Sequence, residues 1–260
     1  MGENMRTYDA IQKVSKSIIE DNICDAIIVK GSIGRGEDDE YSDVDMYAVV
    51  SEEKMDEFLN NRLRYLLAYK SIIYRGYENF VGPQVVVIYE DGLHFDLYAV
   101  TKESLPKTDK IKIVYDPKEI MKDYTPEINY MDKSQCIMLF DEILYNFVEA
   151  DGAYKRKNYP WATRILENSI AQSAILLRYL YDKEHGYLGL KNINRVIPNE
   201  QYLWIEEASE NLNVKGYEIA NKRIITILEY FIENVEEDIK EKLNIDFFKW
   251  TKRNLKTILF

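Results

Sequence analysis

Residues 26–50 read AIIVKGSIGRGEDDEYSDVDMYAVV, and this stretch decides the fold of the N-terminal half of the chain. The apolar run Ala26–Val29 predicts a buried strand, and the apolar residues around Asp45 predict a second strand that opens with Asp43. Gly31 and Ser32 follow the first strand and predict a turn into a short helix. Side chains alternate between the faces of a strand, so Asp43 and Asp45 are expected to point the same way.

The two aspartates and the Gly-Ser turn suggest a common chemistry. Like charges on one face repel, and a fold tolerates such a pair chiefly when a divalent cation lies between them. A Gly-Ser turn that leads into a helix offers backbone N–H groups and a hydroxyl group to a phosphate. The sequence therefore predicts a phosphate-binding turn beside metal-binding carboxylates, which is the combination that nucleotide chemistry uses.

The order of these features resembles a known family. The stretch from Gly31 to Asp45, with its Gly-Ser pair, its Gly-x-Gly and its Asp-x-Asp on the next strand, resembles the nucleotidyltransferase superfamily that includes DNA polymerase beta. Within it, the stretch is most similar to the branch that transfers a nucleotide to hydroxyl groups of lincosamide or aminoglycoside antibiotics. The motif covers residues 26–50, and the likeness extends less specifically over the rest of the chain. The alternative from the residues alone is a glycine-rich turn followed by an acidic strand edge.

The resemblance implies a third carboxylate on a later strand, and Asp96 fills that place. Gln84–Tyr89 and Leu93–Val100 predict a two-stranded hairpin in which Asp96 shares a face with His94 and Tyr98. By resemblance, Asp96 ligates a second metal ion or takes the proton from the acceptor hydroxyl. The alternative is an exposed aspartate on an edge strand. His94 is interpreted as a surface histidine rather than as a neighbour of the site.

The resemblance also implies the roles of the acidic residues. Asp43 and Asp45 would hold Mg²⁺ on the triphosphate, and Asp96 would complete a site for two ions and serve as the general base. All three are therefore expected to be both catalytic and metal-binding. Metal ions neutralise the charge that builds on the phosphoryl oxygens during such a transfer.

Nucleotide contacts are expected from glycine, serine and basic residues. Ser32 and the N–H groups near Gly31 would hold the β- and γ-phosphates, and Arg35 either assists them or is solvated. The basic cluster that contains Lys155 and Arg156 precedes Pro160, and the family has a comparable basic turn before its long helix. One of these cations would reach the triphosphate; the alternative is a solvated loop.

The charge of the chain narrows the range of substrates. Its 34 Lys and Arg against 45 Asp and Glu give a formal net charge of −11. Nucleic-acid substrates need a basic surface that neutralises phosphates, so the polymerase, poly(A) and tRNA branches are disfavoured. An acidic surface attracts a cationic small molecule instead, and aminoglycosides and lincosamides carry amines.

Cysteine usage and hydropathy indicate the compartment. Cys24 and Cys136 lie in apolar surroundings on different predicted elements, so we expect buried free thiols, as in a reducing cytoplasm. With two histidines and no Cys-x-x-Cys motif, a zinc site is not expected. We also expect no membrane span and no signal peptide, because no apolar stretch is long enough and Met1–Asn4 leads into a polar amphipathic segment.

The pattern of elements changes near residue 125 and predicts an α+β fold with two domains. Residues 1–125 are expected to form the nucleotidyltransferase domain around a mixed sheet, and residues 126–260 an α-helical bundle that supplies acceptor and phosphate contacts. The first domain should contain helices over Thr7–Asp21 and Glu52–Ala68, a short helix after Ser32, and strands over Ala26–Lys30, from Asp43, over the Gln84–Val100 hairpin and over Lys110–Tyr115. Apolar spacing predicts amphipathic helices over Ser134–Glu149, Trp161–Tyr181 and Tyr217–Ile239, with a shorter one starting near Pro198.

The predicted function is therefore an enzymatic one. We expect Mg²⁺-dependent transfer of a nucleoside monophosphate, with ATP as the default donor, to a hydroxyl group of a small molecule, with release of pyrophosphate. A lincosamide or an aminoglycoside is the expected acceptor class, and dimers are common among the relatives. Two alternatives stay open: a transferase that modifies a protein, as in toxin–antitoxin systems, and a catalytically idle nucleotide-binding scaffold.

Overall fold

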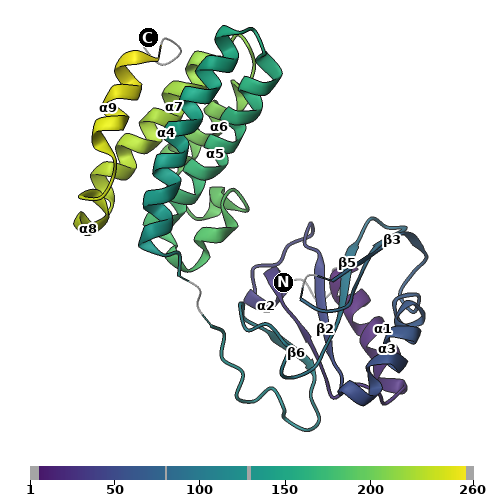
Figure 1. The fold of residues 1–260 in the computed structure, drawn as a ribbon. Helices are drawn as coiled ribbons and strands as arrows, with labels where there is room; N and C mark the ends of the chain where they lie inside the picture. Colours follow the sequence, from purple (N-terminus) through teal and green to yellow (C-terminus); the bar gives the residue numbers. More distant parts are fainter. Residues whose placement is uncertain (1–5, 80, 128–129, 256–260) are drawn as a thin grey trace. The chain divides into compact units, whose positions relative to one another are not determined.

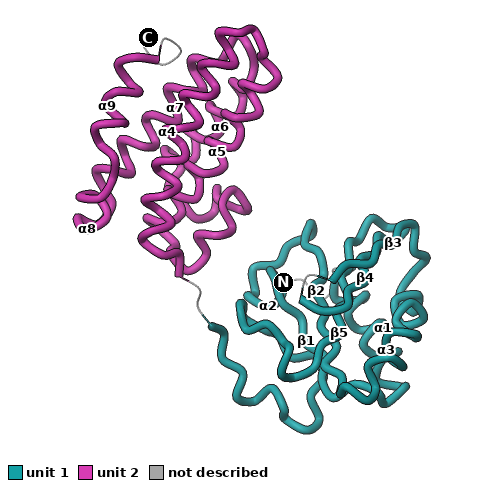
Figure 2. The backbone as a smooth tube through the Cα atoms, viewed as in Figure 1, with its two compact units in different colours: residues 1–128 teal, residues 129–260 magenta. Residues whose placement is uncertain are grey.

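The computed structural model describes residues 6–79, 81–127 and 130–255, and it divides the chain into two compact units (Figure 2). Residues 1–128 form the first unit and residues 129–260 the second, and each is described here by itself. The first contains a mixed β-sheet with helices, and the described part of the second is helical (Figure 1). The predicted α+β class is confirmed.

The sheet of the first unit has the strand order β3-β4-β5-β2-β1-β6. β2 and β5 pair in parallel, and every other neighbouring pair is antiparallel. β1 is apolar and buried along its whole length, as is typical of a strand that is covered on two sides. The strands are β1 (Ala26–Val29), β2 (Val44–Val49), β3 (Ile72–Glu78), β4 (Gln84–Tyr89), β5 (His94–Val100) and β6 (Lys112–Tyr115).

One face of this sheet packs against the helices α1 (Arg6–Glu20) and α3 (Glu52–Leu66) (Figure 1). The alternating residues Val44 and Met46 of β2 point to this face, and the helices contribute apolar side chains to the same core. Because these residues are buried on the helical face, the residues between them on β2 and β5 point to the opposite face. Asp45 and Asp96 therefore face away from α1 and α3.

The opposite face is covered at one end by residues 101–124, which have little regular structure outside β6. Leu105 and Met121 of this segment pack with the apolar residues of β1, β2 and β5. Tyr47 and Tyr98 lie on this face as a cross-strand stack, with ring centroids 4.2 Å apart. A short helix, α2 (Gly31–Arg35), follows β1.

The sequence did not predict β3, which lies at the edge of the sheet. Its sequence contains Arg75 and Gly76, and its residues are half-buried or exposed on both faces. No burial pattern of period two therefore marks it in the sequence. β6 is also shorter than expected, because Lys110 and Ile111 lie outside the strand.

The second unit is built from two long helices, α4 (Lys133–Lys155) and α5 (Tyr159–Tyr181), and several shorter ones. α4 begins with a capping box in which Asp132 and Gln135 satisfy backbone N–H groups, and Pro160 lies in the first turn of α5, as expected. The remaining helices are α6 (Asn199–Glu210), α7 (Tyr217–Asn234), α8 (Glu237–Lys240) and α9 (Ile245–Asn254), with 3₁₀ turns over Lys183–Leu188 and Ile193–Arg195.

Two expected helix ends are wrong. α4 continues beyond Glu149 to Lys155, so the basic cluster begins on the helix itself. The predicted helix over Tyr217–Ile239 stops at Asn234, where Val235 adopts an extended conformation. Glu236 then accepts hydrogen bonds from Lys183 and Tyr179, and this bonding accompanies the break before α8.

Both cysteines are buried free thiols, as expected. Burial raises the pKa of Cys24 to about 11 and that of Cys136 to about 12, so both are protonated near neutral pH. Within the described part of the chain, none of the helices has the length and apolar character needed to cross a bilayer.

The core of the helical unit generates a test of stability. Leu177 of α5 is fully buried, whereas Leu203 of α6 is 47% exposed. Leu177→Ala should lower the free energy of unfolding by about 2–5 kcal/mol, because the transfer free energy is lost and a cavity remains. Leu203→Ala, the matched control, should cost about 0.5 kcal/mol or less. Urea titration followed by far-UV circular dichroism measures both, and equal losses would contradict the packing described here.

Candidate active site

Asp45 and Asp96 are direct neighbours on two parallel strands. In the register of β2 and β5, Asp45 pairs with Asp96 and Tyr47 pairs with Tyr98. Residues in register on one face of a sheet have their side chains close together. β5 lies between β4 and β2, so the alternative of an aspartate on an edge strand is excluded for Asp96.

The expected strand opening at Asp43 is wrong: β2 begins at Val44, and Asp43 lies in the loop directly before it. The backbone N–H of Asp39 donates to the Ser42 hydroxyl over 2.9 Å, and the N–H of Tyr41 donates to the Asp39 carboxylate over 3.1 Å. These bonds form a tight turn that ends directly before Asp43. The negative charge of Asp43 raises the pKa of Asp96, so the two carboxylates are close enough to interact electrostatically.

The environment of Asp96 raises the pKa of its carboxyl group above the ordinary value. Burial of the carboxyl raises its pKa, the nearby His94 lowers it, and the charge of Asp43 raises it again, with a net upward shift. His94 Nε2 shares a hydrogen bond of 3.0 Å with Asp96 Oδ1. His94 is 41% exposed, as expected of a surface histidine, and its hydrogen bond to Asp96 also makes it a neighbour of the candidate site. Gln84 on β4 also forms a hydrogen bond to Asp96.

The backbone conformation at position 31 and the closeness of Asp45 both require glycine there. Its φ of +64° lies in the left-handed region that favours glycine. A Cβ built on Gly31 would lie far inside van der Waals distance of Asp45 Oδ2. The backbone N–H of Lys30 also donates to the carbonyl oxygen of Asp45 over 3.0 Å. The start of α2 and the Asp45 carboxylate are therefore in close contact.

The first turn of α2 keeps the features expected of a phosphate-binding turn. No side chain caps its N-terminus at Lys30, and the first N–H groups of a helix have no partner within the helix itself. Ser32 is half-buried in this turn, one residue after Gly31. The contact of these two residues with a nucleotide stays a prediction.

Lys30 is a site neighbour that the sequence analysis missed. The side chain is buried, its ammonium group donates to the carbonyl oxygen of Pro106, and it lies 4.9 Å from the centre of the Tyr47 ring. Burial lowers the pKa of Lys30 to about 8, against the opposing charges of Asp109 and Asp45. A lysine directly before a Gly-Ser turn is a usable signal, but its burial depends on contacts with a segment far along the chain.

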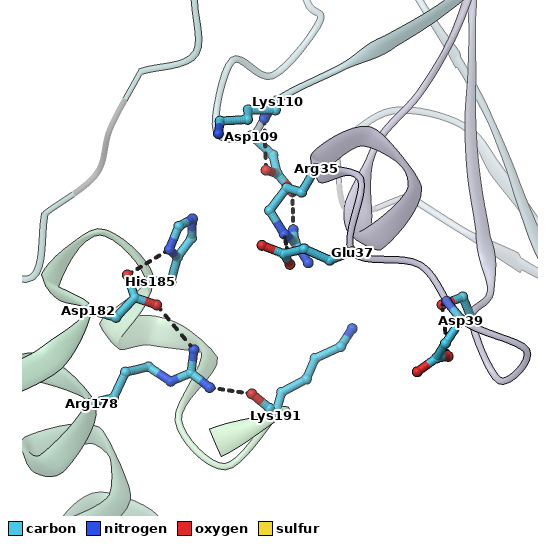
Figure 3. A network of polar contacts seen from close by, with 10 residues as sticks. Arg35, Glu37, Asp39, Asp109, Lys110, Arg178, Asp182, His185 and Lys191 are labelled. Atoms are coloured by element: carbon cyan, nitrogen blue, oxygen red, sulfur yellow. Dashed lines mark hydrogen bonds and ion pairs between the residues drawn. The ribbon is translucent and has the colours of Figure 1, made fainter. Parts of the chain in front are cut away.

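Arg35 lies at the end of α2 and takes part in two ion pairs (Figure 3). Its Nε contacts Glu37 Oε2 at 2.8 Å, and one terminal nitrogen contacts Asp109 Oδ2 at 2.6 Å. Only 8% of the Arg35 side chain is exposed, so the alternative of a solvated arginine is wrong. Its contact with a nucleotide remains untested.

The predicted basic contacts Lys155 and Arg156 belong to the helical unit. Both are exposed, and Lys155 forms an ion pair with the buried Asp151 one turn earlier on α4. The same unit contains a second polar network (Figure 3). There the buried Arg178 donates to the carbonyl oxygen of Gly189 over 3.1 Å, and an ion pair joins it to Asp182.

Asp43, Asp45 and Asp96 offer the oxygen donors that Mg²⁺ prefers. The upward shift of the Asp96 pKa indicates that this group would gain from a nearby cation. Across the residues that the structure describes, however, no group of three or more His, Cys, Asp or Glu side chains has the arrangement of a metal site. The donor set fits Mg²⁺ by its chemistry, and its assembly around an ion stays a prediction.

Comparisons with known proteins find likenesses among solved structures. No family model and no curated protein sequence matches the chain. Among solved structures, an aminoglycoside 6-adenyltransferase from Bacillus subtilis aligns with 11% sequence identity and a TM-score of 0.32, over 94% of this chain and 97% of that one. A TM-score this low carries no argument, so the proposals below rest on the residues of this chain.

The contact between Gly31 and Asp45 can be tested with a matched pair of substitutions. Gly31 and Gly36 both have positive φ, but a Cβ on Gly36 would meet nothing within 4 Å. Gly36→Ala should therefore cost about 1–2 kcal/mol from backbone strain alone. Gly31→Ala should cost more, because the methyl group also displaces the Asp45 carboxylate. Urea unfolding measures the difference, and equal costs would contradict the close approach.

The raised pKa of Asp96 predicts a dependence of stability on pH. The folded chain binds the Asp96 proton more tightly than the unfolded chain does. The contribution of Asp96 to stability therefore falls as pH rises from the unfolded-state pKa of this carboxyl group to its higher folded-state pKa. Asp96→Asn should therefore be more stable than the parent chain at about pH 7, and the gain should vanish below about pH 3. Urea titrations at a series of pH values measure this, with Asp56→Asn on α3 as an exposed control. A loss of stability at neutral pH would contradict the prediction.

Proposed function

We propose that this chain is a Mg²⁺-dependent nucleotidyltransferase that moves a nucleoside monophosphate from a nucleoside triphosphate to a hydroxyl group of a small molecule. ATP is the expected donor. One observation carries the proposal: the register of β2 and β5 sets Asp45 beside Asp96, on the face where Gly31 begins α2 against Asp45. The nearby Asp43 supplies the third carboxylate.

The residues of this chain would divide the work as follows. Gly31 and Ser32 would bind the phosphates through their N–H groups and the hydroxyl. The acceptor oxygen would attack the α-phosphorus and form a new P–O bond, while the bond to the oxygen that bridges to the β-phosphate breaks and pyrophosphate leaves. The hydroxyl proton would pass to Asp96. Burial raises the pKa of Asp96, which makes it a stronger base than a solvated carboxylate.

Asp43 and Asp45 would hold one Mg²⁺, and Asp96 would contribute to a second. When bound, Mg²⁺ would neutralise the charge of the triphosphate and of the oxygens around the α-phosphorus. Asp43 and Asp45 would thereby orient the triphosphate for displacement in line with the leaving group. Lys155 and Arg156 are proposed as further contacts to the triphosphate.

The net charge of the chain is the basis for the proposed class of acceptor. The net charge of −11 favours a cationic small molecule over a nucleic acid, and a hydroxyl group beside an amine fits both requirements. Aminoglycosides and lincosamides have this chemistry, so they are the first acceptors to test. No residue of the described helices is assigned to the acceptor.

The proposed function is tested by pyrophosphate release from MgATP in the presence of each member of an aminoglycoside and lincosamide panel. Release should require one acceptor and should fall at least about 100-fold in Asp45→Asn, because the charge of a metal-binding carboxylate is lost. Asp56→Asn, an exposed aspartate on α3, removes a carboxylate elsewhere and should leave the rate unchanged.

The outcomes separate the candidate functions. Release that depends on Asp45 and on one small acceptor supports the proposal and identifies the substrate. Tight nucleotide binding without release for any acceptor would favour a protein acceptor or an idle site. A chain that binds no MgATP at all would contradict the assignment of the site.

A further inference from the structure

α2 is too short to hold its own shape. It has five residues, Gly31–Arg35, and two of them are glycines. The nucleus of an isolated helix is unfavourable, and short helices are stable only through tertiary contacts. Glycine adds a further entropic cost. The conformation of the turn that begins with Gly31 and Ser32 must therefore be imposed by neighbouring parts of the chain.

The neighbour that contacts α2 along its length is a stretch far away in the sequence, residues 106–110, here called the clamp segment. At the start of α2, Lys30 donates to the carbonyl oxygen of Pro106. In the middle, the backbone of Gly34 approaches Lys110 so closely that a Cβ on Gly34 would lie 2.6 Å from its carbonyl oxygen. At the end, Arg35 forms its 2.6 Å ion pair with Asp109.

The contact at the end of α2 is well shielded from solvent. Only 8% of the Arg35 side chain and 15% of the Asp109 side chain are exposed. Asp109 is itself fixed, because its carboxylate accepts from the backbone N–H of Lys110 over 2.8 Å (Figure 3). Its carbonyl oxygen also accepts from the Tyr124 hydroxyl over 2.6 Å. Removal of Asp109 leaves Arg35 with the exposed Glu37 as its ion-pair partner, so the shielded half of its ion pairing is lost, which is costly.

We propose that the clamp segment positions the Gly31-Ser32 turn against Asp45, and that Arg35 and Asp109 are positioning residues of the site. Arg35 then acts through Asp109 and not by touching the nucleotide. The part of this inference that concerns the nucleotide rests on the proposed function. The part that concerns the shape of α2 does not.

The substitution Asp109→Asn distinguishes a positioning role of the Arg35–Asp109 pair from direct binding of the nucleotide by charge. An aspartate repels a triphosphate, so Asp109→Asn would strengthen nucleotide binding if charge alone acted. If the clamp positions the turn, the same substitution weakens binding. Arg35→Gln and Asp109→Asn should then both weaken binding, and the double variant should be no worse than Arg35→Gln alone, because both substitutions remove the Arg35–Asp109 pair.

The first measurement is hydrogen exchange in the chain without nucleotide. The backbone N–H groups of Gly34, Gly36 and Glu37 donate within or next to α2, to Lys30, Ile33 and Ser32 respectively. In Asp109→Asn these amides should exchange at least roughly tenfold faster, while those of β2 and β5 stay unchanged. Unchanged exchange at α2 would overturn the clamp. Unchanged exchange in the two strands also shows that the variant is folded.

The second measurement is the dissociation constant of α,β-methylene-ATP with Mg²⁺. Arg35→Gln and Asp109→Asn should each weaken binding by roughly tenfold. The matched control is Arg64→Gln, which removes an Arg–Asp ion pair with Asp21 between α3 and the end of α1 and should leave binding unchanged.

The outcomes of the two measurements are distinct. Weakened binding in Arg35→Gln alone would overturn the proposal and make Arg35 a direct contact. Tighter binding in Asp109→Asn would overturn it as well. If the parent chain binds no nucleotide, the proposed function fails, while the exchange of the α2 amides still supports or overturns the clamp.

Discussion

The parallel pairing of β2 and β5 is the constraint on which the candidate site depends. Parallel strands in register bring equivalent positions side by side, and here that places Asp45 beside Asp96. A shift of β2 by one residue against β5 would turn Asp45 into the core beneath α1 and α3 and separate it from Asp96. The apolar residues Val44 and Met46 therefore fix the direction of the acidic residues as firmly as they fix the core.

The features that form the candidate site also lower the stability of the fold. Asp96 is buried enough that its pKa is raised, and Asp43 adds a like charge nearby. Gly31 has a backbone conformation that costs other residues strain, so that α2 can begin against Asp45. Costs of this kind concentrate at functional sites, where a bound ligand offsets them. The network of Lys30, Arg35 and Asp109 contributes stabilising contacts around the same turn.

The sequence predicted those parts of the site that depend on local periodicity. Alternation placed Asp96 on one face with His94 and Tyr98, and the apolar run before Gly31 predicted β1. The surroundings of Lys30 and Arg35 could not be predicted, because they depend on residues 106–110, which have no periodic pattern and lie more than seventy positions away. β3 was missed for a related reason: an edge strand with both faces in contact with solvent carries no alternation.

The most direct test of the central claim is a crystal structure with Mn²⁺ and α,β-methylene-ATP. Mn²⁺ takes the same oxygen ligands as Mg²⁺ and can be located by its anomalous scattering. We predict Mn²⁺ at about 2.0–2.3 Å from carboxylate oxygens of Asp43 and Asp45, with phosphates against Gly31 and Ser32. A metal ion and nucleotide bound elsewhere, with these carboxylates unligated, would contradict the account.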